Sequence, residues 1–270
     1  MSTVDINAQK EQMLLQQQIE QPKSSVLAFS LPCGYLSPDG TLHTELVLRE
    51  MTGREEDLLA SKKTPGNKKM NELFVRCIER LGSLTSKDQI AAAVPELLLG
   101  DRTYLMFAIR RVTLGDEYPF RHRCPSCDKE ALYIVDLSEM KVQEMKDPKK
   151  RIYDGVLSNG LTYRFHLLNG RDEAKLAEVN DSERKLTQAM ITKLDMLAER
   201  PAGFDQVQGL SSSLRNELRT KFDEVDGGVD TEMEIVCPKC EHEFFTELDV
   251  GPGFFFPSAM QKNSKKRSST

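Results

Sequence analysis

The sequence predicts an α+β fold built from two related halves that share one four-cysteine, zinc-ribbon-like centre. Three observations predict it. Two CPxC motifs stand 113 positions apart, similar residues recur in the same order before each motif, and short strand patterns accompany helical ones in each half. Two CPxC motifs supply four thiolates, the full ligand set of a tetrahedral structural zinc site. We expect each half to contain a β-hairpin, helices, a zinc knuckle and a following strand.

Length and composition indicate which classes of protein the chain can belong to. The chain has 270 residues, of which 39% are hydrophobic and 29% charged, as is typical of a folded chain with a core. No apolar run approaches the roughly 20 residues that cross a bilayer, so we expect no membrane contact. The Gln-rich start has no apolar stretch suited to secretion, which predicts a reducing, cytosolic location. A net charge of −5 makes nucleic acid an unlikely main partner.

Four segments are expected along the chain. They are a Gln-rich N-terminal arm over 1–25, a first repeat lobe over 26–140 with the CPSC motif, a second repeat lobe over 141–257 with the CPKC motif and a Phe-rich end, and a basic flexible tail over 258–270. The arm has apolar residues at a loose helical spacing, namely Met13, Leu14, Leu15 and Ile19. It is either frayed in the isolated chain or ordered on a partner.

Each lobe is expected to open with a β-hairpin. The turn signals are Pro38-Asp39-Gly40 in the first lobe and Asn159-Gly160 in the second. The returning strands are then expected over 42–48 and 161–167.

A helix is expected to follow each hairpin. Thr52 and Glu55 have the spacing of a capping box, in which the side chain of each residue accepts a hydrogen bond from the backbone N–H of the other. Asn169 and Asp172 have the same spacing in the second lobe, and Asn is also a good N-cap residue.

Two longer helices are expected after these short ones in each lobe. In the first lobe the apolar stripes are Leu73, Phe74, Cys77, Ile78 and Leu81, ended by Gly82, and Leu105, Ile109 and Val112, ended by Gly115. In the second lobe they are Leu186, Met190, Leu194 and Leu197, with Pro201 beyond the end, and Leu214, Leu218, Phe222 and Val225, ended by Gly227-Gly228. The spacing of these residues is that of one helix face.

The cysteines carry the strongest chemical signal. Cys124, Cys127, Cys237 and Cys240 are expected to bind one structural Zn²⁺ per chain. Redox chemistry and disulfides are the alternatives, but a redox CxxC normally occurs once, at the start of a helix that follows a strand. Separate sites completed by histidine are disfavoured, because His122 and His242 do not align between the halves.

The remaining cysteines and the aromatic end are expected to have other roles. Cys77 fits the apolar helix stripe, whereas Cys33 is a candidate free surface thiol. Three consecutive aromatics, Phe254, Phe255 and Phe256, cannot all face one side of a strand. We expect some of them to close the core and some to anchor a neighbouring subunit.

No catalytic pattern is present. The sequence lacks GxGxxG, GxxxxGK[ST], HExxH and GxSxG, which predicts a protein that is not an enzyme.

Several stretches together resemble a known family. They are Leu31-Pro32-Cys33-Gly34-Tyr35, the run from Leu48 to Glu56 (LREMTGREE), Leu114-Gly115-Asp116-Glu117-Tyr118 before the CPSC motif, and Gly253-Phe254-Phe255-Phe256-Pro257 after the CPKC motif. In this order, they resemble the baseplate hub and hub-assembly proteins of contractile-tailed, T-even-like bacteriophages. The resemblance covers roughly residues 26 to 257, and it implies a non-enzymatic component of the tail baseplate.

The sequence therefore predicts a zinc-braced structural or assembly protein that acts through contacts with other phage tail and baseplate proteins in a hetero-oligomeric assembly. It would be found in the host cytoplasm during assembly, and in the virion tail baseplate if it is retained. The alternative is a zinc-ribbon protein that binds nucleic acid, suggested by Arg121, Arg123 and Lys129 beside the first CPxC motif and opposed by Glu241 and Glu243 beside the second. A thiol-based enzyme is the third hypothesis.

Overall fold

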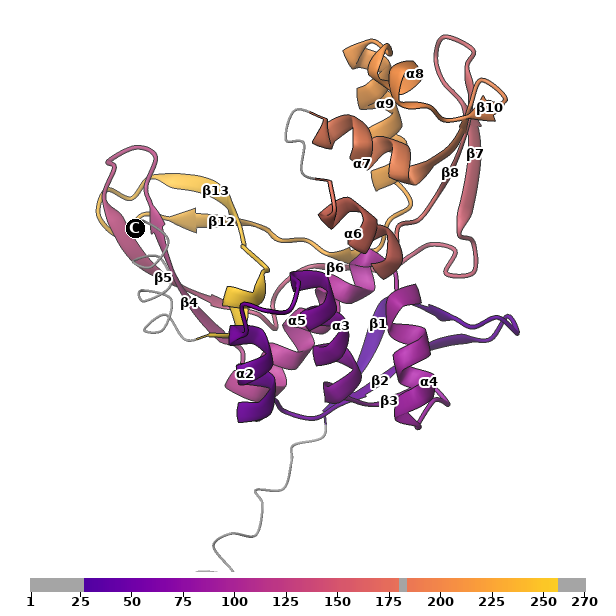
Figure 1. Ribbon diagram of the computed structural model, residues 1–270. Helices are drawn as coiled ribbons and strands as arrows, with labels where there is room; N and C mark the ends of the chain where they lie inside the picture. The colour runs from indigo at the N-terminus through magenta and orange to yellow at the C-terminus, as the bar shows by residue number, and fades with distance from the viewer. Residues whose placement is uncertain (1–26, 180–183, 257–270) are drawn as a thin grey trace, which may run out of the picture.

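Helices and small antiparallel sheets alternate in a computed structural model, which describes residues 27–179 and 184–256. The predicted α+β class is confirmed. Figure 1 shows three parts, namely a first lobe at the bottom, a second lobe above it, and a pair of long hairpins beside them. The N-terminal arm (1–25) and the basic tail (258–270) lie outside the described residues.

The first lobe is a three-stranded sheet with helices packed on it. Its strands are β1 (Leu27–Leu36), β2 (Leu42–Leu48) and β3 (Ile78–Leu81), in the order β1-β2-β3. Its helices are α2 (Gly53–Ala60), α3 (Gly66–Cys77), α4 (Lys87–Ala93) and α5 (Leu99–Leu114), with a 3-10 turn η1 (Val94–Glu96) before α5. The core lies between the sheet, α3 and α5, where Leu46, Leu73 and Ile109 are fully buried.

The second lobe repeats this arrangement with one more strand. Its sheet has the order β10-β9-β8-β7 and consists of β7 (Ile152–Val156), β8 (Thr162–His166), β9 (Leu194–Leu197) and β10 (Arg200–Pro201). Its helices are α6 (Gly170–Ala177), α7 (Lys185–Lys193), α8 (Phe204–Gln208) and α9 (Ser212–Asp223). Phe165, Leu197 and Leu218 lie at the centre of its core.

The third part consists of two hairpins from distant parts of the chain. One pairs β4 (Glu117–Arg123) with β5 (Glu130–Asp136), and the other pairs β12 (Glu232–Val236) with β13 (Glu243–Glu247). We call these two hairpins the ribbon. A short pair, β6 (Val142–Gln143) with β11 (Gly228–Val229), and a 3-10 turn, η2 (Pro252–Phe255), complete the described elements.

The first of the two longer helices predicted in each lobe ends earlier than expected, which corrects the sequence prediction. The chain passes directly from α3 into β3 at Ile78, and from α7 into β9 at Leu194. Ile78 and Leu81 therefore face the core from a strand, as do Leu194 and Leu197. Their three-residue spacing fits a helix face, but pairing with the second strand of the hairpin satisfies the backbone and buries the same side chains.

The two lobes share their strand order and, next to the hairpin turn, their pairing register, although β1–β2 has a register shift between Ser30 and Tyr35 that β7–β8 lacks. The turn glycines Gly40 and Gly160 both have positive φ, at 82° and 87°, and they occupy corresponding positions in the two hairpins. Each second strand then pairs with the third strand through a single irregularity, between Val47 and Leu48 in one lobe and between Arg164 and Phe165 in the other.

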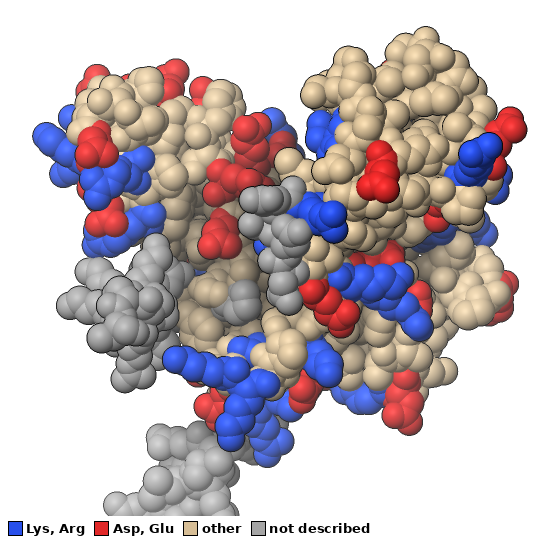
Figure 2. All heavy atoms as spheres, turned by 45° about the horizontal axis from the view of Figure 1, so that its top comes forward, with Lys and Arg blue, Asp and Glu red and all other residues tan. Residues whose placement is uncertain are grey.

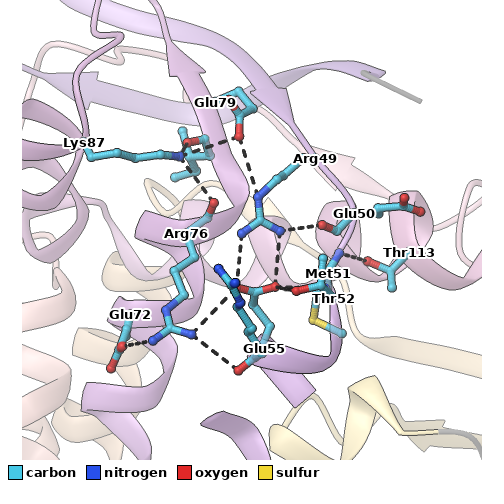
Figure 3. A network of polar contacts seen from close by, with 12 residues as sticks. Arg49, Glu50, Met51, Thr52, Glu55, Glu72, Arg76, Glu79, Lys87 and Thr113 are labelled. Carbon is cyan, nitrogen blue, oxygen red and sulfur yellow. Dashed lines mark hydrogen bonds and ion pairs between the residues drawn. The ribbon is translucent and has the colours of Figure 1, made fainter. Parts of the chain in front are cut away.

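A polar network at the start of α2 also has a counterpart in the second lobe. Figure 3 shows Glu55 held between Arg49, Arg76 and Thr52, and its carboxylate accepts hydrogen bonds from the Thr52 backbone N–H at 2.9 Å and hydroxyl at 2.8 Å. Arg49 contacts both Glu55, at 3.1 Å, and Glu79, at 3.7 Å. The corresponding contacts in the second lobe join His166 to Asp172 at 3.4 Å and to Asp195 at 2.7 Å, and Asn169 caps α6.

The lobes contact each other directly, where α5 meets α6 (Figure 1). Arg102, which is 4% exposed, forms an ion pair with Glu173 at 2.7 Å. The Leu99 N–H donates to the Leu168 carbonyl at 3.0 Å, and Gly100 lies against the backbone of Gly227. None of the described helices is long and apolar enough to cross a lipid bilayer.

Candidate metal centre

Each CPxC motif forms the turn of one ribbon hairpin. The residue after each second cysteine, Asp128 or Glu241, has positive φ, at 55° and 60° respectively. The backbone bonds are also the same, namely Cys124 N–H to Lys129 O (3.1 Å), Asp128 N–H to Cys124 O (2.9 Å), Cys237 N–H to His242 O (2.9 Å) and Glu241 N–H to Cys237 O (2.9 Å). These two turns therefore present their cysteines in the same way.

The four predicted cysteines converge in space. The Sγ atoms of Cys124 and Cys240 are 3.7 Å apart, and those of Cys127 and Cys237 are 3.8 Å apart. All four sulfurs lie within 4.8 Å of one another. Both close pairs join one hairpin to the other, so each hairpin contributes to a single group of ligand atoms.

The group of sulfurs fits a tetrahedral ion. Zn–S bonds of about 2.3 Å place the sulfurs of a tetrahedron about 3.8 Å apart, which matches the two short separations. All six cysteines are free, and a disulfide would bring two sulfurs to about 2 Å. Neither His122 nor His242 belongs to the cluster, in keeping with one shared site over two separate ones.

The surroundings of the sulfurs favour thiolates together with a cation. Burial raises the pKa of the Cys237 thiol, but backbone N–H groups of Lys239 and Cys240 outweigh burial and lower that pKa to about 6. The His242 backbone N–H favours the Cys240 thiolate, yet burial and the three other sulfurs together raise the pKa of Cys240 to about 12. The four thiolates therefore cannot all form easily without a positive ion to offset their mutual repulsion.

Apolar packing holds the two hairpins face to face. Ala131 and Tyr133 on β5 pack against Ile235 on β12 and Phe244 on β13, and all four side chains are buried. This small core lies directly beneath the buried sulfurs of Cys124 and Cys237. The sequence predicted the strand that follows each knuckle but not this contact, although the alternation of apolar residues in each strand is its signal.

A family model described as "T4 bacteriophage base plate protein" matches residues 36–256, most of the chain. The chain belongs to this family. The match includes the second lobe, the first lobe from the end of β1 onward, and all four clustered cysteines. No curated protein and no solved structure matches the chain.

The family match confirms the T4-like phage baseplate resemblance that the sequence predicted. A base plate protein of this family is a structural component of the phage tail, which gives the chain a place in the virion tail and other tail proteins as neighbours.

The two isolated cysteines are both buried in this base plate protein. Cys77 packs in the core of the first lobe, as predicted. The expectation of a surface thiol at Cys33 was wrong, because its side chain is 2% exposed. Its backbone N–H donates to Asp101 at 2.8 Å, and burial raises the pKa of the thiol. This contact spans distant positions and leaves no local trace in the sequence.

The aromatic end divides between core and surface. Phe254 and Phe255 are 1% and 2% exposed, so these two close the core, the role that the sequence predicted for some of the three. Phe254 packs against Phe107 and Tyr118, with ring centroids 5.1 and 4.9 Å away, and its carbonyl accepts a hydrogen bond from Arg110. Phe256 is half-buried, and a partner contact there stays a prediction.

The charges on the ribbon disfavour a phosphate backbone as its ligand. The outer face of the β12–β13 hairpin presents four exposed glutamates, namely Glu232, Glu234, Glu243 and Glu247. In Figure 2 acidic side chains also line the flank of the ribbon that faces the second lobe, and cations gather on the opposite flank. The cations are themselves partly paired, for example Arg123 with Asp128 at 3.4 Å. Such a surface suits contacts with proteins better than with nucleic acid.

Proposed function

We propose that this protein is a non-enzymatic structural or assembly component of the hub region of a phage tail baseplate. It is braced by one structural zinc ion and acts through contacts with neighbouring tail proteins. The observation that carries the proposal is the family match over 36–256, which includes every element that positions the cysteine cluster. The protein would act in the host cytoplasm during assembly and stay in the virion tail if it is retained.

The proposed zinc ion has a structural role because of its ligand set. Cys124, Cys127, Cys237 and Cys240 fill all four positions of a tetrahedral site, which leaves none for a water or substrate. When bound, the ion would supply positive charge that holds the four thiolates together. A zinc site of this type stabilises the structure that places its ligands, here the two ribbon hairpins.

We also propose that the two halves, 26–140 and 141–257, are copies of one ancestral unit. Matching pairing beside the hairpin turns, matching irregularities between the second and third strands, and matching knuckle turns support the proposal. The ribbon then contains one hairpin from each copy. Chance could supply one of these correspondences, but their common order along the chain favours duplication.

Metal analysis tests the zinc proposal. Protein purified reduced and without chelator should contain about one zinc per chain. Cys127→Ala and Cys240→Ala should each lower this content and abolish the thiolate-to-metal absorption of the Co²⁺-loaded protein. Cys33→Ala, which removes a buried thiol outside the cluster, is the matched control and should keep the metal. Wild-type protein without metal would refute the zinc brace and leave the baseplate role standing.

Analysis of tails tests the hub proposal. In the phage that encodes this chain, removal of the gene should stop baseplate assembly, and expression of the chain in trans should restore it. Density for purified tail tips or assembly intermediates should contain the chain beside the central hub proteins. Its absence from both tails and intermediates would refute the proposal, whatever the metal content of the isolated protein.

A further inference from the structure

The outer face of the β12–β13 hairpin carries large apolar side chains that no described residue covers. Phe245 is 64% exposed and Val236 is 52% exposed. Their neighbours Phe244 and Ile235 face the small core of the ribbon, so Phe245 and Val236 point away from it. The two form a diagonal pair across the strands, which is within reach of an aromatic ring. Within the described chain, no second ring and no cation lies against Phe245.

Glutamates surround this aromatic side chain. Glu234 lies directly opposite Phe245, and Glu243 and Glu247 lie two positions before and after it on the same face of β13. Glu232 is paired with Glu247, and like charges directly opposite each other destabilise a pair of strands. None of the four glutamates forms an ion pair with a Lys, Arg or His among the described residues. The face therefore combines an exposed ring with negative charge that the described chain does not neutralise.

The β4–β5 hairpin carries its own cation at the equivalent place. Counted from the CPxC motifs, Leu132 takes the position of Phe245. Arg121, which lies opposite Leu132, takes the position of Glu234. The Arg121 guanidinium is 3.9 Å from Glu130, and both hairpins have a glutamate at that position. The β12–β13 hairpin thus keeps the apolar centre and the carboxylate, but it lacks the guanidinium.

We propose that this face binds an arginine-bearing segment of a neighbouring tail protein, with a guanidinium stacked on Phe245 and paired with Glu234 and Glu243. A flat guanidinium can stack on a ring and donate two parallel hydrogen bonds to a carboxylate, whereas an ammonium is a strongly hydrated point charge. The apolar stem of the same arginine would cover Val236. The inference rests on the proposed tail role only for the source of the segment.

A peptide titration tests the face on the whole, zinc-loaded protein. The probe is a capped peptide that alternates arginine with serine, and a second peptide has lysine in place of arginine. The sequence has no Trp, so Phe245→Trp puts a single reporter in the face and keeps a ring for stacking. The arginine peptide should change the emission of this reporter and bind several-fold tighter than the lysine peptide. Leu132→Trp is the matched control, because Leu132 is 49% exposed at the equivalent position, and its emission should stay unchanged.

Two kinds of variant separate stacking from net charge. Phe245→Ala should weaken binding of the arginine peptide about two- to five-fold, the range of an exposed cation–π contact, with an unchanged far-UV circular dichroism spectrum. Glu234→Gln combined with Glu243→Gln should weaken binding at least as much. The control pair, Glu56→Gln with Glu178→Gln, removes the same charge from exposed positions in the lobes. It should change the affinity by less than about twofold.

Several results would overturn the proposal. They are wild-type affinity in Phe245→Ala, equal affinity for the two peptides, and equal weakening by the control pair. Self-association that rises with concentration and disappears in Phe245→Ala would assign the face to the Arg121 side of a second copy, and would also overturn it.

The source of the segment is tested in the phage. A chain with Phe245→Ala and Glu234→Gln should fail to restore baseplate assembly to a deletion mutant that the wild-type chain restores. Full restoration by this variant would overturn the inference and leave the hub proposal standing.

Discussion

Glu55→Gln should lower the free energy of unfolding by about 3 kcal/mol at pH 7. Glu55 is 2% exposed and lies at the centre of the network in Figure 3. Burial raises its pKa, but hydrogen bonds from Arg49 and Thr52 outweigh burial and lower the pKa from 4.5 to about 2. Gln keeps the shape and one acceptor oxygen, so the variant isolates the negative charge.

The pH dependence of this loss follows from the direction of the shift. A carboxyl whose pKa falls on folding stabilises the protein fully above its unfolded pKa of 4.5, and loses this contribution as pH falls through about 2. The difference between Glu55→Gln and wild type should therefore shrink to less than half by about pH 3. Urea unfolding followed by far-UV circular dichroism at both pH values measures it.

Glu56→Gln is the matched control for this experiment. Glu56 also lies in the first turn of α2, but its side chain is exposed. Its loss should cost less than about 1 kcal/mol, the usual contribution of an exposed charge near a helix end. Equal destabilisation by the two variants at pH 7 would refute the network argument. So would a cost of Glu55→Gln that stays constant down to pH 3.

Three further predictions concern buried sites. Asp101→Asn should gain stability relative to wild type as pH rises from about 4 to 7 in urea unfolding, because burial raises the Asp101 pKa to about 6 and its stabilising contribution is lost through that range. Gly100→Ala should cost about 2 kcal/mol or more in thermal unfolding, because a Cβ would lie 1.8 Å from the Gly227 carbonyl oxygen. Phe254→Ala should cost about 3–5 kcal/mol in urea unfolding, since it empties a buried site between two aromatic rings.

Each of these variants has a matched control elsewhere in the chain. Asp88→Asn removes an exposed first-turn carboxylate and should cost less than about 1 kcal/mol at pH 7. Gly53→Ala adds a methyl group to another helix start, where nothing lies within 4 Å, and should be tolerated. Phe245→Ala truncates a side chain that is 64% exposed and should cost less than about 1 kcal/mol. If a variant changes the measured stability no more than its control does, the contact assigned to that residue is refuted.

Features that depend on neighbouring residues were predictable from the sequence. The glycine turns at 40 and 160, the acidic residues that complete the caps at 55 and 172, and the paired cysteines all lie where the sequence places them. Each depends on the conformational preference or the chemistry of a few adjacent residues. The convergence of the cysteines was also predictable, because four thiolates of one tetrahedral site must meet.

Features that depend on distant pairing were not predictable in the same way. The apolar spacing of Ile78 and Leu81 fits a helix as well as a short strand, and only β2, more than 30 positions earlier, decides between them. Cys33 is buried because it belongs to an apolar cluster with Leu98 and Met145, which lie far from it in the sequence. The core position of Phe254 likewise depends on Phe107, a residue far away in the sequence.

The direct contact between the lobes changes what a metal ion has to do. The sequence predicted one zinc centre shared by the two halves, yet the halves also meet away from the cysteines, where Arg102 and Glu173 join α5 to α6 and Gly100 packs on Gly227. The cysteines instead lie in the turns of the ribbon hairpins, beside a small apolar core. This small number of buried side chains stabilises the ribbon only weakly. A two-stranded hairpin by itself is at most marginally stable in water. An ion bound there would therefore stabilise the ribbon as a rigid projecting surface, because its four ligands all lie in the turns of the ribbon hairpins.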